Sequence, residues 1–143
     1  MKNILFVCTG NSARSIIAET IINNKYQSQF KGYSAGSKPS EKINNYIKDY
    51  LLKKQYDVSN CYPKNFTTFL DSDIIMDYVV TVCNNANEEI CPIWPKKNKI
   101  IHWDIKDPVI SLNKTAKLND KYKIIEKTYN AINQKIENLI NGY

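Results

Sequence analysis

Apolar residues along the chain occur either in short continuous runs or in longer stretches with helical spacing. The run at residues 4–7 is short and rich in large apolar side chains, which is typical of a strand buried in a sheet. A similar run lies at residues 78–82, residues 99–103 are a further strand candidate, and residues 33–37 look like a short strand that runs into a loop. In the other stretches, apolar residues recur every three or four positions, which predicts amphipathic helices.

The predicted elements alternate along the chain. We expect strands at residues 3–8, 33–37, 78–82 and 99–103, and helices at about 14–29, 41–54, 66–75 and 119–141. The last helix has one apolar stripe: Tyr122, Ile125, Tyr129, Ile132, Ile136 and Leu139. Packing on the sheet of its own domain explains this stripe better than a coiled-coil dimer does. The alternation predicts a three-layer α/β fold with a mainly parallel sheet.

Composition narrows the class of protein. A chain of 143 residues fits one domain, residues 1–143, that can bury a substantial core. The net charge of +6 suits anionic substrates, but the lysines are scattered and accompany no nucleic-acid motif. No apolar run approaches membrane-spanning length, and a signal peptide's long apolar region is absent. The four cysteines, one of them in a candidate reactive loop, favour a reducing compartment over a secreted disulfide scaffold. We expect a cytoplasmic monomer that binds neither nucleic acid nor membranes.

The candidate chemistry begins where the first strand ends. Cys8 and Arg14 enclose five small residues, which are Thr9, Gly10, Asn11, Ser12 and Ala13. Such residues let backbone N–H groups converge on one anion, and the N-terminus of the helix beginning near Ser15 points to the same place. Arg14 supplies a planar charged fork for an oxyanion, and these surroundings favour a nucleophilic Cys8 thiolate. The alternative is a buried cysteine before an ordinary helix cap.

Other reactive residues follow later strands. Ligands in parallel α/β folds bind at the carboxyl ends of the strands, where Cys83 and Asp107 are expected. Asp107 precedes a proline and could protonate a leaving oxygen, although an Asp-Pro turn explains it equally well. Asp104 is the competing carboxylate.

Two further cysteines suggest redox chemistry. Cys83 and Cys91 enclose a polar segment, and beside a reactive Cys8 they suggest a disulfide relay. A zinc site is a poor alternative, because the chain has a single histidine, His102. Without Cys8, we would interpret Cys83 as a core residue at a strand end and Cys91 as an incidental surface thiol. Cys61 is interpreted as a spectator thiol.

Several of these segments together resemble a known family. They are residues 7–15, 33–36 and 79–83, Cys91-Pro92, and His102-Trp103 through Asp107-Pro108. They resemble the thioredoxin-coupled arsenate reductases of arsenical resistance, which are built on the low-molecular-weight tyrosine phosphatase fold. The resemblance covers nearly the whole chain and implies a four-stranded parallel sheet flanked by helices.

The resemblance also implies a mechanism. The Cys8 thiolate attacks arsenate held by the loop and Arg14, while Asp107 protonates the departing hydroxide. Cys83 then attacks Cys8 and expels arsenite, Cys91 attacks Cys83, and thioredoxin reduces the resulting disulfide. No cofactor is needed, and phosphate or sulfate would compete as anions.

The same resemblance assigns supporting residues. Ser15 resembles the serine that favours the thiolate, and Asn11 keeps the loop in shape. Asn11, Glu19 and Ser34 match positions that bind potassium in some members, although the remaining aspartate of that site has no match.

The chain departs from the family in the spacing of its relay cysteines. Cys83 and Cys91 are eight residues apart rather than seven, an overshoot of roughly 80° on a rigid helix. Glutaredoxin or another thiol could therefore replace thioredoxin as the electron donor.

Two other functions remain open at this point. A tyrosine or small-molecule phosphatase would use Cys8, Arg14 and Asp107 with water as the second nucleophile. Phosphatases of this fold carry aromatic residues after the Asp-Pro pair, whereas Val109 and Ile110 stand there in this chain. A non-catalytic module that binds phosphate is the second alternative.

Overall fold

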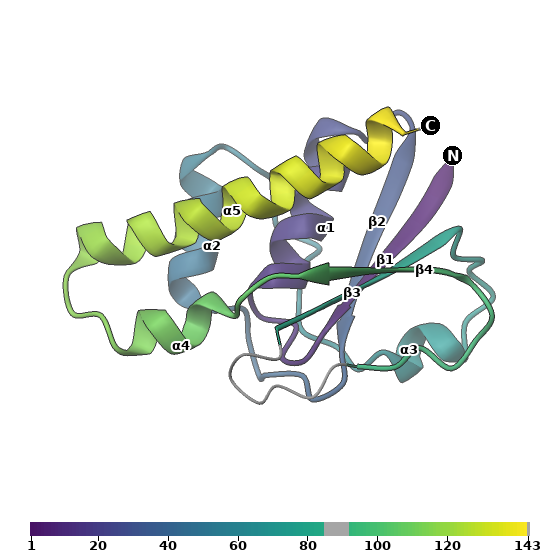
Figure 1. Ribbon diagram of the computed structural model, residues 1–143, viewed down its shortest axis with the longest axis horizontal. Coiled ribbons are helices and arrows are strands. Elements are labelled where there is room, and N and C mark those ends of the chain that lie inside the picture. The colour runs from purple at the N-terminus through teal and green to yellow at the C-terminus, as the bar shows by residue number, and fades with distance from the viewer. Residues whose placement is uncertain (85–91, 143) are drawn as a thin grey trace.

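The computed structural model describes residues 1–84 and 92–142 (Figure 1). Its elements in chain order are β1 (Lys2–Cys8), α1 (Arg14–Lys25), β2 (Phe30–Gly36), α2 (Asn45–Lys53), α3 (Thr67–Leu70), β3 (Tyr78–Cys83), β4 (Lys99–Asp104), α4 (Pro108–Asn113) and α5 (Leu118–Asn141). Among these described residues, no helix combines the length and apolar character needed to cross a membrane.

The strands that the structure describes form one parallel sheet. Their order is β2-β1-β3-β4, so the first strand of the chain lies inside the sheet. Val7 of β1 pairs with Ala35 on one side and with Thr81 on the other. The four apolar residues at positions 4–7 are fully buried, as expected for a strand covered on both faces. Because all pairs are parallel, the carboxyl ends of β1 and β3 lie side by side.

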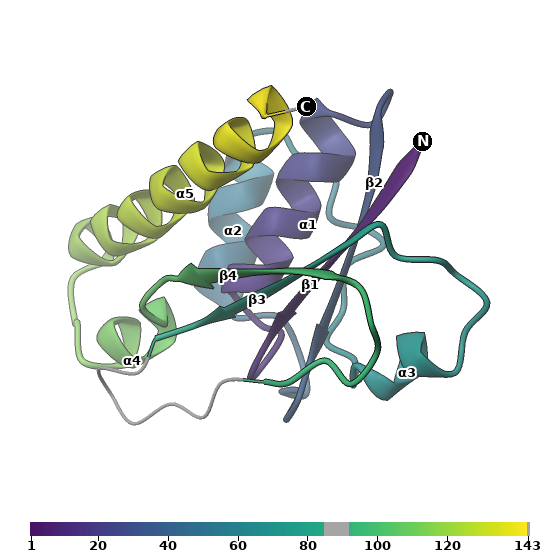
Figure 2. The ribbon, with the colours of Figure 1, turned by 45° about the vertical axis from the view of Figure 1, so that its right-hand side comes forward.

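Helices cover both faces of the sheet. Figure 2 shows α1, α2 and α5 together on one side and α3 on the other. Leu5 and Val7 point to the α3 side, where they pack in a cluster with Phe69, Met76 and Trp94. The structure thus confirms the three-layer α/β fold and the parallel sheet.

The long last helix follows the predicted stripe. Ile125, Tyr129, Ile132 and Ile136 are buried, and Tyr122 and Leu139 at the two ends of the stripe are half-buried. α5 packs on α1, α2 and α4 of the same chain, and its buried residues share one core cluster with Val80 and Trp103 of the sheet. The predicted packing within the domain is confirmed, and neighbouring helices share it with the sheet.

Element boundaries differ where local hydrogen bonds end or begin a helix. The predicted helix at 41–54 begins only at Asn45, because the side chain of Asn44 accepts the N–H groups of Tyr46 and Ile47. The helix predicted at 14–29 ends at Lys25, and the chain turns there into β2. The predicted 66–75 helix was too long, since only Thr67–Leu70 is helical.

One short helix was not predicted. α4 follows the Asp107-Pro108 pair, which the sequence suggested only as a turn or an acid. Asp107 is the N-cap residue of α4 and accepts the N–H of Val109 at 3.0 Å, while Pro108 occupies the first helical turn. An N-cap and a proline are signals for a helix start, but the helix is too short to give a periodic pattern.

Candidate active site

The site begins at Cys8, the last residue of β1. Its side chain is almost fully buried, and its sulfur lies 2.9 Å from Ser15 Oγ at the start of α1. The backbone N–H of Asn11 donates to the same sulfur over 3.2 Å. Two polar groups therefore already contact the sulfur, and both can donate to a thiolate.

Asn11 holds the loop in the shape that aims these donors. Its φ of 49° lies in the left-handed region, which asparagine tolerates better than most residues. Its side-chain amide donates to Ser15 Oγ at 2.7 Å, and its Oδ1 accepts the backbone N–H of Lys64 at 3.0 Å. Because Ser15 Oγ already accepts from Asn11, its own hydrogen is available to the Cys8 sulfur.

The end of β2 presses against this loop. A Cβ on Gly36 would lie 2.5 Å from the carbonyl oxygen of Thr9, closer than real side chains come. Gly36 also pairs with Cys8 in the sheet register. Glycine is required here because the backbones of β2 and the loop approach so closely.

Arg14 and Asp107 lie together at the loop. The Arg14 guanidinium is buried and donates to the carbonyl of Ile105 at 2.9 Å, and its second terminal nitrogen is 4.0 Å from Asp107 Oδ2. The other oxygen of Asp107 caps α4, which fixes the direction of the carboxylate. The predicted nucleophile, cation and acid are therefore brought together from three parts of the chain.

These groups line one small cavity of about 110 Å³. Its lining residues are Cys8, Gly10, Asn11, Ser12, Ala13, Arg14, Ser40, Asp107 and Val109. The volume is far below the range of about 300–1,000 Å³ that holds drug-sized ligands. A single tetrahedral oxyanion matches the scale of this cavity, and Arg14 in its lining suits the negative charge.

Two details of the lining differ from the sequence prediction. Thr9 belongs to the loop but does not line the cavity, whereas Ser40 does. The backbone N–H of Ser40 donates to the carbonyl of Gly10 at 2.9 Å, which folds residues 37–44 over the loop. Nothing in the local sequence around Ser40 signals this long-range contact.

The competing carboxylate lies elsewhere. Asp104 does not line the cavity, and its Oδ1 accepts a hydrogen bond of 2.8 Å from the side chain of Asn84. It therefore joins the ends of β3 and β4. Of the two carboxylates, Asp107 is the one beside Arg14.

Cys83 ends β3, the strand next to β1, and its side chain is fully buried. It is disulfide-bonded in the structure, whereas Cys8 and Cys61 are free thiols. Cys91, the third predicted relay residue, lies outside the described residues. The structure therefore describes two of the three relay cysteines, at the ends of neighbouring parallel strands.

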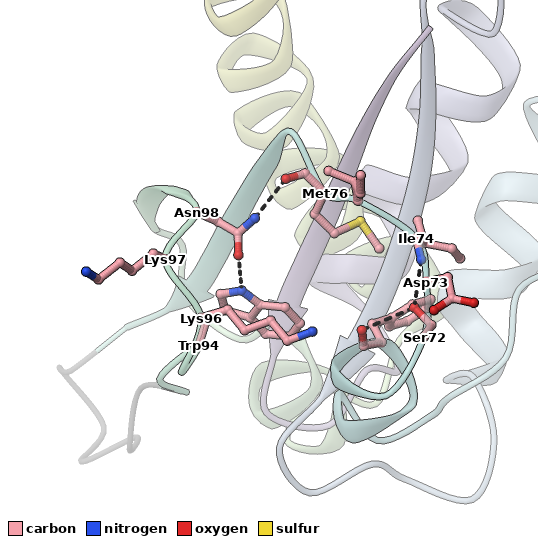
Figure 3. Close-up of a pocket in the computed structure, with 10 residues that line it drawn as sticks. Ser72, Asp73, Ile74, Met76, Trp94, Lys96, Lys97 and Asn98 are labelled. Atoms are coloured by element: carbon pink, nitrogen blue, oxygen red, sulfur yellow. Dashed lines mark hydrogen bonds between the residues drawn. The ribbon is translucent and has the colours of Figure 1, made fainter.

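The chain that follows Cys91 is fastened to the sheet by Trp94. Figure 3 shows its indole nitrogen donating to Asn98 Oδ1 at 2.7 Å, while the Asn98 amide donates to the carbonyl of Met76 at 2.8 Å. The Trp94 ring is buried against Phe66. A cavity of about 250 Å³ beside it, also lined by Lys96, shares no residue with the cavity at Cys8.

The residues expected for potassium face a lysine. Burial raises the pKa of Glu19, although a hydrogen bond from Ser34 and the charge of Lys64 partly lower it. The Lys64 ammonium donates to the backbone carbonyl of Ser34 at 3.0 Å. The Lys64 ammonium thus lies in the region where the resemblance implies a potassium ion.

Cys61 borders the same region, and its surroundings disfavour the thiolate. Burial, followed by the charge of Glu19, raises the pKa of its thiol to about 11. Its sulfur lies 3.6 Å from Thr20 Oγ1. These contacts agree with the interpretation of Cys61 as a spectator.

Fold and site together define a class of protein, and comparisons with known proteins agree. The profile of the family described as low molecular weight phosphotyrosine protein phosphatase matches residues 3–143. The chain therefore belongs to the low molecular weight phosphotyrosine protein phosphatase family.

Its similar relatives include arsenate reductases. The arsenate reductase of Bacillus subtilis is 37% identical over 109 residues, which cover 75% of this chain and 74% of that protein. The solved structure titled "An arsenate reductase in the phosphate binding state" superposes with a TM-score of 0.79 at 19% identity, covering 99% and 98% of the two chains. The thioredoxin-dependent arsenate reductase of Corynebacterium glutamicum superposes with a TM-score of 0.64 at 21% identity, covering this whole chain and 64% of the other.

Proposed function

We propose that this protein is an arsenate reductase that converts arsenate to arsenite through a Cys8 adduct and a relay of Cys8, Cys83 and Cys91. One observation carries the proposal: Cys8, Arg14 and Asp107 surround a small cavity, and a second cysteine, Cys83, ends the adjacent parallel strand. A hydrolase needs the first three residues but has no use for the fourth. The naming of the curated relatives agrees with this proposal.

The first step is displacement at arsenic. Arsenate binds to the backbone N–H groups of the loop and to the guanidinium of Arg14, which stabilise its charge. The Cys8 thiolate, held by Ser15 and Asn11, attacks arsenic and forms a sulfur–arsenic bond. Asp107 gives a proton to the departing oxygen, which leaves as water.

The second step is the reduction. The sulfur of Cys83 attacks the sulfur of Cys8 and forms the Cys8–Cys83 disulfide. The sulfur–arsenic bond breaks, its electron pair stays on arsenic, and arsenite leaves. Two thiol sulfurs are oxidised while arsenic gains two electrons, so the step balances.

Regeneration uses the third cysteine. Cys91 attacks Cys83, which releases Cys8 and leaves a Cys83–Cys91 disulfide for an external thiol to reduce. We propose thioredoxin as this reductant, and the name of the Corynebacterium glutamicum relative supports the choice. The eight-residue spacing keeps glutaredoxin as the alternative donor.

The proposal has further parts. The protein acts in the cytoplasm as a single-domain monomer, takes its electrons from a thiol partner, and uses no bound cofactor. Phosphate and sulfate compete with arsenate because the loop recognises a tetrahedral anion.

A coupled assay tests the proposal. Purified protein should consume NADPH when arsenate, thioredoxin and thioredoxin reductase are all present, and omission of any one should stop consumption. An aryl phosphate assay runs beside it, and glutaredoxin with glutathione replaces thioredoxin in a third series. No arsenate-dependent consumption with either donor would overturn the proposal.

Phosphatase activity is the second candidate, because Cys8, Arg14 and Asp107 also suit phosphate ester hydrolysis. Val109, which lines the cavity, stands where phosphatases of this fold carry an aromatic residue. Val109 cannot supply the aromatic contact that such a residue makes with a phosphotyrosine ring. Rapid aryl phosphate hydrolysis without arsenate turnover would favour this candidate.

A further inference from the structure

The histidine of this chain lies between two residues of the neighbouring strand. His102 on β4 pairs with Thr81 on β3 in the sheet register. Its Nδ1 lies 3.0 Å from Thr81 Oγ1, and its Nε2 lies 3.8 Å from Cys83 Sγ. Both ring nitrogens are therefore directed to side chains of β3, and one of these is a predicted relay cysteine.

Cys83 differs from Cys8 in what surrounds it. The Cys8 sulfur contacts a loop N–H and a serine hydroxyl at the N-terminus of α1. Cys83 ends a fully buried strand, and burial disfavours the thiolate that nucleophilic attack requires. The imidazole of His102 is exposed on the edge strand, so it can exchange a proton both with Cys83 and with solvent.

The arrangement has the parts of an activated nucleophile. A base lies within reach of the nucleophilic sulfur, and a third group, Thr81, fixes the ring of the base. Histidine suits the task because its ordinary titration range is close to neutral pH. Asp104 lies two positions further along β4, on the same face as His102. Its carboxylate accepts a hydrogen bond from the side chain of Asn84.

We propose that His102 is the proton acceptor and donor for Cys83, and that Thr81 positions its ring. The inference rests on the proposed function and extends it to a residue outside the cavity at Cys8. Cys83 is disulfide-bonded in the structure, so the contact shows His102 beside the sulfur in its oxidised form.

Protons and electrons balance over the cycle. When Cys83 attacks Cys8, its thiol proton moves to His102 Nε2, and the electron pair of the sulfur–arsenic bond stays on arsenic. When the thiol of a protein dithiol later attacks the Cys83–Cys91 disulfide at Cys91, Cys83 leaves with the bonding pair. His102 then returns the proton to Cys83.

The test isolates the step that His102 serves. In the Cys91→Ser background, the relay stops at the Cys8–Cys83 disulfide, whose formation after one addition of arsenate is measured by rapid quench, alkylation and mass spectrometry. We expect His102→Gln to slow this step by about 10²-fold near neutral pH, with the rates converging in alkali where Cys83 ionises unaided. Asp104→Asn, a change on the same face of β4, serves as the matched control and should keep the rate.

Two readouts separate this role from a structural one. Alkylation of Cys8, and its protection by phosphate, should be unchanged in His102→Gln. An equal rate, or a loss that is the same at every pH, would overturn the role of His102. If the Cys91→Ser protein with His102 intact forms no Cys8–Cys83 disulfide and no arsenite, the proposed function itself fails.

A second measurement does not depend on the folding of a His102 variant. Because the chain has one histidine, the nitrogen NMR signals of its ring are unambiguous. In the reduced protein, we expect the Nε2 signal to change between wild type and Cys83→Ser across the neutral range. Identical ring signals in the two proteins would contradict a proton exchange between His102 and Cys83.

Discussion

At the scale of single residues, the contrast between Cys8 and Cys61 shows how surroundings set thiol reactivity. Cys8 contacts two potential hydrogen-bond donors, whereas Cys61 is buried beside the carboxyl group of Glu19. Burial raises the pKa of Cys61 to about 11, so this thiol stays protonated far above neutral pH. Of these two thiols, Cys8 lines the cavity beside Arg14.

Selective alkylation tests this contrast. At slightly acidic pH, iodoacetamide should label Cys8 before Cys61, because the thiolate is the reactive form. Bound phosphate or arsenate should protect Cys8, as read by peptide mass spectrometry, and Cys8→Ser should abolish arsenate turnover. Preferential labelling of Cys61 would show that the wrong nucleophile has been chosen.

The acid role of Asp107 can be separated from its capping role. Asn caps a helix about as well as Asp, so Asp107→Asn should leave the free energy of unfolding nearly unchanged. The same change removes the proton donor. We expect arsenate turnover to fall by roughly 10²–10⁴-fold with phosphate binding retained. Asp104→Asn is the matched control, and a large loss there without one in Asp107→Asn would reverse the assignment.

At the scale of elements, Lys64 in the loop between α2 and α3 contacts the residues that hold the loop after Cys8 in place. Lys64 holds Asn11 through its backbone and faces Glu19 of α1 and Ser34 of β2 through its ammonium group. Burial lowers the pKa of Lys64 and raises that of Glu19, because it disfavours the charged form of each group. The opposite charge of each group offsets part of the desolvation cost of burying the other.

Removing this cation should make stability depend on pH. In Lys64→Met, the pKa of Glu19 should rise further, because the charge that lowers it is lost. A carboxyl group with a raised folded-state pKa destabilises the fold as pH rises through that pKa and it ionises. We expect a loss of about 1–3 kcal/mol at neutral pH that shrinks as pH falls toward the ordinary Glu19 value of 4.5.

Denaturant unfolding at neutral pH and near pH 4.5, the ordinary Glu19 value, measures this change in the free energy of unfolding. The control compares Glu19→Gln with the Glu19→Gln, Lys64→Met double variant: without the carboxyl group, loss of Lys64 should change stability by a similar amount at both pH values. A loss in Lys64→Met that does not change with pH would contradict the pairing.

From the position of Lys64 we also predict how arsenate turnover responds to potassium. Since a side-chain cation already faces Glu19, arsenate turnover by wild type should be equal in potassium and sodium chloride at the same ionic strength. A specific activation by potassium would show that the ion binds despite Lys64.

Sequence patterns predicted the long periodic elements and missed one short helix and one long-range contact. The run at residues 4–7 and the stripe of α5 were confirmed because burial on a sheet imposes a clear period. α4 spans only Pro108–Asn113, and its start depends on the cap of Asp107 rather than on a period. The role of Lys64 was also missed, because only the fold brings it beside Glu19.

At the scale of the whole molecule, the parallel sheet explains why candidate residues were expected at the carboxyl ends of its strands. β1 and β3 are adjacent and parallel, so Cys8 and Cys83, far apart in the sequence, both stand at the carboxyl ends of neighbouring strands. The fold class and the resemblance to arsenate reductases are both confirmed. The sequence could not show that Thr81 and Cys83 would direct both ring nitrogens of His102, since that contact depends on the strand register.

The central claim is that three cysteines pass one disulfide along the molecule, and trapping it in Cys91→Ser is the most direct test. Thiol–disulfide exchange forms one disulfide at a time, so a blocked step should accumulate its predecessor. Treated once with arsenate, Cys91→Ser should release one arsenite and retain a Cys8–Cys83 disulfide without turning over. Full arsenate turnover with thioredoxin in both Cys83→Ser and Cys91→Ser would contradict the account.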